Sequence, residues 1–161
     1  MTEESPSARY LDRKAIEAIH AALSAWAVRN GDEPIPPLSH AKSADIEFLI
    51  HAPQQRFFGR DAYTTLEEKA AIIFYLINKR QIFLNGNKRM SVMCLLVFLA
   101  INDKLLKVPA DELTQKALWL ANTSSLEFPV IKAELAAWIR DHLGEASTVQ
   151  DGGQGYVRKD V

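Results

Sequence analysis

The chain has 161 residues, of which 48% are hydrophobic and 24% are charged, values typical of one globular domain with a sizeable core. Its net charge of −1 argues against a general coat for nucleic acid or for a membrane surface, so a basic site must be local. The longest apolar run, from Val92 to Ile101, is too short to span a bilayer, and the N-terminus lacks an apolar secretory segment. We therefore expect a cytoplasmic protein.

The residue pattern of the N-terminal region predicts a polar leading segment followed by one amphipathic helix. Residues 1–9 are expected to be disordered. Asp12 is the predicted N-cap of the helix that follows, and Gly31 is a suitable stop. The apolar stripe of this helix consists of Ile16, Ile19, Leu23 and Trp26.

A short second helix and an irregular segment come next. Ser43 is expected to cap the helix and Pro53 to close it. Residues 54–64 show no helical spacing. They contain two adjacent aromatic residues, Phe57 and Phe58, which either contact a partner or close the core.

A third helix begins with the spacing of a capping box, formed by Thr65 and Glu68. Its inward face is predicted to carry Leu66, Ala70, Ile73, Phe74 and Ile77. The helix leads into a small basic loop, since four of the eleven residues from Lys79 to Arg89 are basic.

The fourth helix is predicted from about Asn87 to Asn102. It is apolar on nearly every side, which is typical of a helix at the centre of a bundle. The only cysteine, Cys94, lies within this run and is interpreted as a small core residue.

Two more amphipathic helices complete an all-α bundle around the buried fourth helix. One starts near Ala110, and the other has Pro129 in its first turn and ends at Gly144. Their predicted inward residues are Leu113, Ala117, Leu118 and Leu120 in the first, and Val130, Leu135, Trp138 and Ile139 in the second. Residues 145–161 are polar and glycine-rich, and we expect a flexible tail.

The junction between the basic loop and the fourth helix has the features of an anion site. The first backbone N–H groups of a helix have no partner within it and carry partial positive charge. Lys88 and Arg89 add two full charges in the first turn, where a helix alone favours acids. A bound phosphate would remove this penalty. A solvated basic loop is the alternative interpretation.

Residues 81–89 read Gln-Ile-Phe-Leu-Asn-Gly-Asn-Lys-Arg. They resemble the signature of the Fic/Doc (Fido) family, whose usual form is His-x-Phe-x-Asp/Glu-Gly/Ala-Asn-Gly/Lys-Arg. The matching positions are Phe83, Gly86, Asn87, Lys88 and Arg89. Gln81 stands at the position of the family histidine and Asn85 at that of the family carboxylate. The resemblance implies a Fic/Doc-like domain over residues 10–144, with the helical bundle of the Fido fold and a small flap hairpin.

What the resemblance implies chemically is ATP-dependent modification of a protein, with Mg²⁺ as the metal. Gly86, Asn87, Lys88 and Arg89 would bind the phosphates, with Lys88 and Arg89 also serving catalysis, and Phe83 would anchor the loop. In active relatives the histidine takes the proton of the target hydroxyl, which is worth about 10²–10⁴ in rate. The Gln81 amide does not titrate near neutral pH and cannot replace it.

The metal ligand and the catalytic base at the same site are also affected. Asn85 is a weak candidate for the metal, because an amide oxygen binds Mg²⁺ less strongly than the family acid. His40 and His51 lie in or near irregular segments and are alternative bases, although an exposed histidine without a catalytic role is commoner.

The branch of the family is suggested by two other positions. Relatives that transfer AMP usually have glycine in place of Lys88 and a second arginine in place of Val92. The present residues resemble Doc, which transfers a phosphoryl group from ATP to a translation factor and is the toxin of a toxin–antitoxin pair. We expect a Doc-like toxin that transfers phosphoryl, or less readily adenylyl, to a protein hydroxyl, with transfer impaired at Gln81. The alternatives are a catalytically silent Fido domain that binds nucleotide or a partner, and a helical scaffold that binds no nucleotide.

Regulation and target contact are also implied by the resemblance. Many relatives carry an inhibitory helix of the form Ser/Thr-x-x-x-Glu-Gly/Asn, and the chain has no such pattern. We therefore expect an antitoxin protein in trans. Residues 55–63 are the candidate flap that contacts the target.

Overall fold

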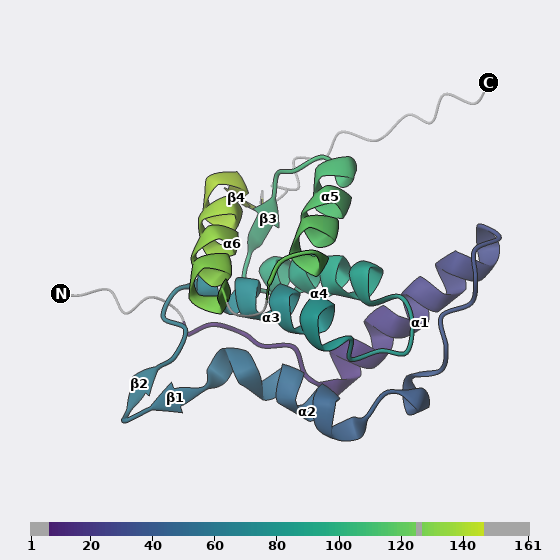
Figure 1. The fold of residues 1–161 in the computed structure, drawn as a ribbon, viewed down its shortest axis with the longest axis horizontal. Coiled ribbons are helices and arrows are strands. Elements are labelled where there is room, and N and C mark those ends of the chain that lie inside the picture. The colour runs from purple at the N-terminus through teal and green to yellow at the C-terminus, as the bar shows by residue number, and fades with distance from the viewer. Residues whose placement is uncertain (1–6, 125–126, 147–161) are drawn as a thin grey trace, which may run out of the picture.

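The computed structural model describes residues 7–124 and 127–146, and these ranges are mostly helical (Figure 1). The helices are α1 (Arg13–Arg29), α2 (Ser43–His51), α3 (Leu66–Arg80), α4 (Asn87–Ile101), α5 (Ala110–Ala121) and α6 (Phe128–His142). Two single-turn 3₁₀ helices, η1 (Leu38–His40) and η2 (Ala52–Gln54), flank α2. The predicted all-α fold is confirmed.

The centre of the bundle is formed by α3 and α4. Helix α4 contacts α1, α3 and α5, and α3 also contacts α6 (Figure 1). The largest fully buried side chains of these two central helices are Phe74, Ile73 and Ile77 from α3 and Met90, Leu95, Phe98 and Leu99 from α4. Helix α4 has so little polar surface that it is stable only when other helices cover it. This explains its central position.

Helix starts follow local capping chemistry at three of the predicted positions. The Asp12 carboxylate accepts a hydrogen bond from the Ala15 N–H at 2.8 Å, and the Thr65 hydroxyl accepts one from the Glu68 N–H at 3.1 Å. Pro129 lies in the first turn of α6. Ser43 does not cap α2. It is the first helical residue, and its hydroxyl accepts a hydrogen bond from Arg13 of α1 instead.

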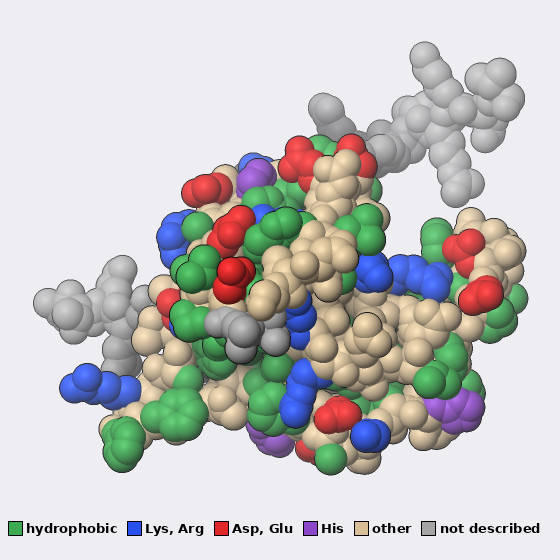
Figure 2. Space-filling model, viewed as in Figure 1, with side chains coloured by type: hydrophobic (Ala, Val, Ile, Leu, Met, Phe, Trp, Pro, Cys, Tyr) green, Lys and Arg blue, Asp and Glu red, His purple; other side chains and the backbone are tan. Residues whose placement is uncertain are grey.

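Two short pairs of antiparallel strands complete the described fold. Strands β1 (Arg56–Phe57) and β2 (Arg60–Asp61) form the expected small hairpin, over which hydrophobic side chains gather at the lower left of Figure 2. Strands β3 (Lys104–Leu106) and β4 (Leu143–Glu145) form the second antiparallel pair, which was not predicted and which brings together segments on either side of α5 and α6. Helix α6 therefore ends before Gly144, because Gly144 pairs with Leu105.

The ends of the described chain are tied to the body of the protein. Arg9, which the sequence placed in the lead, exchanges backbone hydrogen bonds with the Asn102 side chain at 2.8 and 2.9 Å. Glu145, which was placed in the tail, pairs with Lys104. The rest of the predicted lead and tail, residues 1–6 and 147–161, lies outside the described residues.

Three apolar residues that were predicted to face inward are exposed. Trp26 and Leu118 are each 44% exposed and Val130 is 65% exposed. Leu118 and Val130 each lie beside a buried neighbour, and one residue of a helix turns the side chain by about 100°. Trp26 lies near the end of α1, which reaches beyond the other helices in Figure 1.

Candidate functional site

The segment from Gln81 to Gly86 connects α3 to α4 through two residues in the left-handed region. Gln81 is exposed and ends α3 at φ 47°, and Gly86 precedes α4 at φ 80°. Glycine adopts this conformation without a steric penalty, whereas glutamine does so at a cost. An exposed, strained residue at a turn between two buried helices is the kind of position where functional side chains are found.

Apolar side chains fix the loop from below. Ile82 and Phe83 are each 3% exposed. The Phe83 ring lies 6.4 Å from the ring of His20, whose Nε2–H donates to the Pro36 carbonyl at 2.9 Å. The loop therefore rests on α1 and on the segment that follows it, through a histidine that the sequence did not indicate.

Asparagine side chains brace the loop from within. The Asn87 amide accepts a hydrogen bond from the Phe83 N–H at 2.9 Å and donates one to the Phe83 carbonyl at 2.7 Å. The Asn85 carbonyl oxygen accepts from the Gly86 N–H at 2.7 Å. One N–H of the Asn87 amide and a second lone pair of the Asn85 oxygen remain for a ligand.

The N-terminus of α4 offers unpaired donors. No side chain caps this helix, and the backbone N–H groups of residues 87, 88 and 89 have no hydrogen-bond partner among the described residues. The next N–H group, that of Met90, is bonded to the Gly86 carbonyl at 2.9 Å. Three adjacent free N–H groups at the positive end of a helix dipole are donors of the kind that bind anions at helix N-termini.

Gly86 also sets how closely the loop approaches the segment after α1. A β-carbon built on Gly86 would lie 3.3 Å from the Cδ1 atom of Ile35, which is itself 5% exposed. Close contact with Ile35 and a positive φ both favour glycine at this position. The N-terminus of α4 is thus packed against the residues that follow α1.

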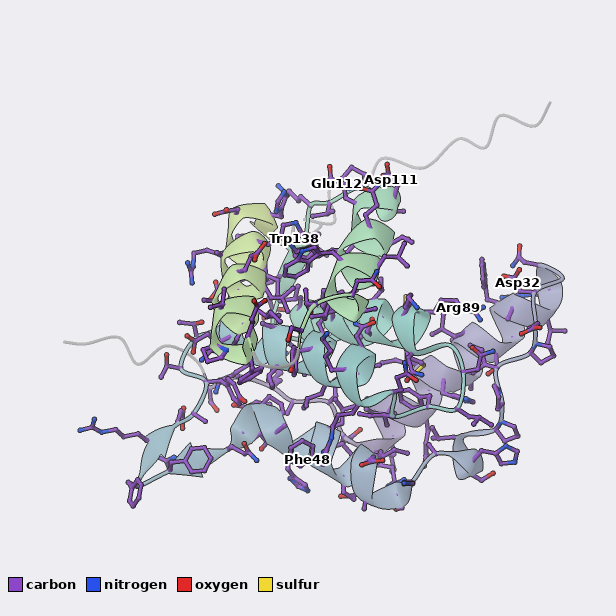
Figure 3. All side chains as sticks on the ribbon, viewed as in Figure 1. Asp32, Phe48, Arg89, Asp111, Glu112 and Trp138 are labelled. Carbon is purple, nitrogen blue, oxygen red and sulfur yellow. The ribbon has the colours of Figure 1, made fainter. Side chains whose placement is uncertain are left out.

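The two cationic side chains of the first turn differ in their surroundings. Lys88 is exposed and has no ion-pair partner within the described ranges. Arg89 is 33% exposed, and its Nη1 atom lies 3.9 Å from the Asp32 carboxylate. Figure 3 shows Asp32 approaching Arg89 from the end of α1. The structure thus places an anionic side chain beside the arginine that was predicted to bind phosphate.

The β1–β2 hairpin is held at its base by a buried lysine. The Lys69 ammonium donates to the carbonyls of Tyr63 at 2.6 Å and Pro53 at 3.3 Å, and lies 3.8 Å from Asp61. At the other end of the hairpin, Phe57 and Phe58 are highly exposed. Of the two interpretations of these aromatic residues, closure of the core is excluded.

The remaining histidines are engaged away from the loop or lie at the surface. His51 ends α2 and lies 3.5 Å from the Glu47 carboxylate. The Nδ1–H of His142 donates to the Trp138 carbonyl at 2.7 Å. His40 is exposed in η1. The structure shows no contact between any of these side chains and Gln81.

A model of the Fic/DOC family matches residues 10–99, more than half of the chain. The chain belongs to the Fic/DOC family. The match runs from the start of α1 to near the end of α4 and so includes the whole Gln81–Gly86 connection. No curated protein matches this Fic/DOC chain closely enough to count as a relative.

The described part of the Fic/DOC chain lacks two further features. It contains no group of three or more His, Cys, Asp or Glu side chains placed to hold a metal ion. No helix in the described ranges has the length and apolar character needed to cross a membrane.

Proposed function

We propose that the protein is a Doc-like toxin of a toxin–antitoxin pair that transfers a phosphoryl group from ATP to a protein hydroxyl, with transfer slowed by the loss of the base at Gln81. The observation that supports this most is the N-terminus of α4, where three free N–H groups adjoin Lys88 and Arg89. Charge neutralisation and positioning are the main requirements of phosphoryl transfer, and this turn has groups for both.

The residues at the turn suit a triphosphate. The free N–H groups of residues 87–89 would donate to phosphate oxygens, and Arg89 would bind one phosphate in a bidentate manner. Asn85 would hold Mg²⁺ through its amide oxygen, and the phosphates would supply further ligands. When bound, Mg²⁺ would supply neutralisation of the charge that develops on the phosphates.

The position of Gln81 defines the proposed defect. Its amide lies exposed at the start of the loop and can orient a hydroxyl by a hydrogen bond, but it cannot accept the proton. Lys88 and Val92 stand where AMP-transferring relatives usually have glycine and arginine, which favours phosphoryl over adenylyl transfer. The target would be a protein such as a translation factor.

A second candidate is a catalytically silent Fic/DOC domain that binds nucleotide or a partner protein. Two observations favour it: Gln81 lacks a titrating group, and Asp32 approaches Arg89. In this case ATP would bind without transfer. Both candidates require the anion site, so nucleotide binding tests them together.

Calorimetry with ATP and Mg²⁺ tests the shared requirement. Arg89→Ala removes a charge-assisted hydrogen bond and should weaken ATP binding about ten- to a hundredfold. Arg140→Ala is the matched control, because Arg140 is exposed near the end of α6 and makes no ion pair with another described residue. No binding by the parent at millimolar ATP, or equal losses in both variants, would contradict the proposal.

An antitoxin in trans is the proposed restraint, since the chain lacks the family's inhibitory pattern. A short segment that folds on binding would cover the site. Gentle purification from the native host followed by mass spectrometry should recover a small partner protein. Recovery of the chain alone, with no partner gene beside its own, would contradict this part of the proposal.

A further inference from the structure

A surface pocket of about 240 Å³ lies between α2, η2, α3 and the start of α6. Its lining is mostly apolar and includes Phe48, Tyr63, Ile72, Tyr75, Leu76 and Phe128. An apolar protein cavity of roughly 150 Å³ is large enough to bind benzene. This pocket therefore has room for one large aromatic or aliphatic side chain.

Two cations lie over aromatic rings of the pocket. The Arg80 guanidinium is 4.5 Å from the centre of the Phe48 ring, and the Lys132 ammonium is 5.4 Å from that of Tyr63. Neither cation forms an ion pair within the described residues, whereas Arg56 and Lys69 of the neighbouring hairpin region share Asp61. The rim of the pocket thus carries positive charge that no carboxylate of the described chain contacts directly.

The pocket also contains two phenol groups. Burial raises the pKa of Tyr63, with further contributions from Glu68 and Tyr75, and burial raises the pKa of Tyr75 as well. Both hydroxyls therefore stay protonated at neutral pH, and neither has a hydrogen-bond partner in the described part of the chain. They are available as donors to a polar group that enters beside an apolar side chain.

A carboxylate that acts electrostatically on this region, that of Glu68, is already engaged. Glu68 accepts a hydrogen bond from the Thr64 N–H at 2.8 Å, and Lys132 helps to lower the Glu68 pKa without an ion-pair contact. Glu68 thus attenuates the charge of Lys132. Arg80 forms no ion pair with a described carboxylate, so its charge is available to an incoming carboxylate.

We propose that this pocket receives one large apolar side chain of a partner-protein segment whose flanking residues are acidic. The aromatic and aliphatic lining would desolvate the side chain, and Arg80 and Lys132 would attract the flanking carboxylates. A small apolar molecule would leave both cations unused. The C-terminal segment of this chain carries Arg158 and Lys159 beside Tyr156, so its charges match the rim poorly.

The pocket leads along α3 toward the candidate site. Ile72, Leu76 and Arg80 are four residues apart and share one face of the helix, and Gln81 follows directly. Gln81 comes nine positions after Ile72, which corresponds to a rise of about 14 Å along the helix. An extended peptide covers this distance in about four residues. If the bound partner segment also carries the hydroxyl that accepts the phosphoryl group, that hydroxyl lies about four residues from the apolar side chain. Only this last step rests on the proposed function.

Synthetic seven-residue peptides with a central Phe test the proposal. The flanking positions are all Glu, all Gln or all Lys, and binding is followed by backbone amide shifts in NMR without nucleotide. We expect binding with the preference Glu over Gln over Lys, about threefold for each cation engaged. Shifts should concentrate at residues 48, 63, 75 and 76. A central Ala should abolish them.

Amino-acid substitutions distinguish peptide binding in the pocket from binding elsewhere on the surface. Phe48→Ala should weaken the Glu-flanked peptide at least tenfold, whereas Leu118→Ala at an exposed position of α5 should not. Arg80→Glu combined with Lys132→Glu should reverse the preference so that the Lys-flanked peptide binds more tightly, and Arg140→Glu should leave it unchanged. Thermal unfolding of each variant shows whether the fold is retained. The charge reversal is a gain of binding, so loss of structure cannot produce it.

Three results would overturn the proposal. No shifts with any Phe-centred peptide at millimolar concentration would show that the pocket does not take such a segment. Equal binding of Glu- and Lys-flanked peptides, or binding of indole alone with similar affinity, would indicate an apolar small-molecule pocket. Tighter binding of a peptide of residues 147–161 would make the chain's own tail the occupant. ATP calorimetry on the same sample measures nucleotide binding independently of peptide binding. Failure of the proposed function can therefore be distinguished from failure of the pocket proposal.

Discussion

The Nη1 atom of Arg89 lies 3.9 Å from the carboxylate of Asp32, so a residue three positions beyond the end of α1 faces the first turn of α4. This separation is at the long end of the range for an ion pair, and the Asp32 side chain is 51% exposed. A loose, half-exposed pair contributes little to stability. Its main consequence is that an anion binding to Arg89 must compete with Asp32.

The first prediction follows from this competition. Asp32→Asn removes the negative charge and should tighten ATP binding about two- to fivefold, because the lost pair is exposed and weak. Glu33→Gln changes the adjacent charge, which forms no ion pair with Arg89, and should have a smaller effect. Titration calorimetry at low and high salt measures both. Weaker ATP binding by the Asp32 variant would show that Asp32 assists the anion.

The second prediction concerns the brace within the loop. Asn87→Ala leaves both the N–H and the carbonyl of Phe83 without a partner and should cost about 1–3 kcal/mol of unfolding free energy. Asn85→Ala frees only the Gly86 N–H, which becomes a further anion donor, and should cost less. Urea denaturation gives both values. Equal costs would mean that the Asn87 amide does not hold the loop.

The third prediction separates backbone strain from steric contact at glycine. Gly86 and Gly31 both have positive φ, at 80° and 71°. A β-carbon at Gly31 would meet nothing within 4 Å, whereas one at Gly86 would meet Ile35 at 3.3 Å. Alanine at either position should cost about 1 kcal/mol for strain, and Gly86→Ala should cost more. Urea denaturation of the two variants, together with Gly86→Ala in an Ile35→Val background, measures the contact. If Gly86→Ala costs no more than Gly31→Ala, the Ile35 contact does not constrain the loop.

Local features of this fold could be predicted from the sequence because they depend on neighbouring residues. Asp12, Thr65 and Pro129 begin helices for reasons of capping and fixed φ that short spacing reveals. The apolar composition of α4 likewise required a central position. These signals extend over one or two helical turns.

Features that depend on distant parts of the chain could not be predicted. Nothing in the spacing of residues indicates that Asp32 reaches Arg89 or that Gly144 pairs with Leu105. The Asn87 amide was expected to face a ligand, and in the structure it binds the backbone of Phe83 on the same loop. A motif shows which groups are present, whereas their hydrogen-bond partners depend on the folded loop.

The fourth prediction concerns pH. Burial raises the pKa of the Cys94 thiol from 9.0 to about 12, so the folded state keeps this proton where the unfolded chain releases it. Stability from this group is complete below pH 9 and declines between pH 9 and 12, by about 1.4 kcal/mol for each pH unit. Parent stability should therefore fall more steeply than that of Cys94→Ala from pH 9 to 10.5. Parallel slopes in urea denaturation would contradict the burial.

The claim that Gln81 is the missing base is tested by Gln81→His. Histidine adopts the left-handed conformation of this position more readily than most residues, so the substitution should preserve the loop. The imidazole would accept the proton of a target hydroxyl, and Asn85→Asp in addition should strengthen Mg²⁺ binding. The inactive control is the same variant carrying Arg89→Ala.

The deciding measurement is label transfer to lysate proteins from γ-labelled and from α-labelled ATP. The account predicts that Gln81→His raises γ-label transfer at least a hundredfold, that the signal increases with pH through about 6.5, and that Arg89→Ala abolishes it. Transfer of the α-label instead would identify the reaction as adenylyl transfer. If the Gln81→His, Asn85→Asp variant is folded and binds ATP yet labels no protein, the impaired-enzyme account is contradicted and the silent binding domain replaces it.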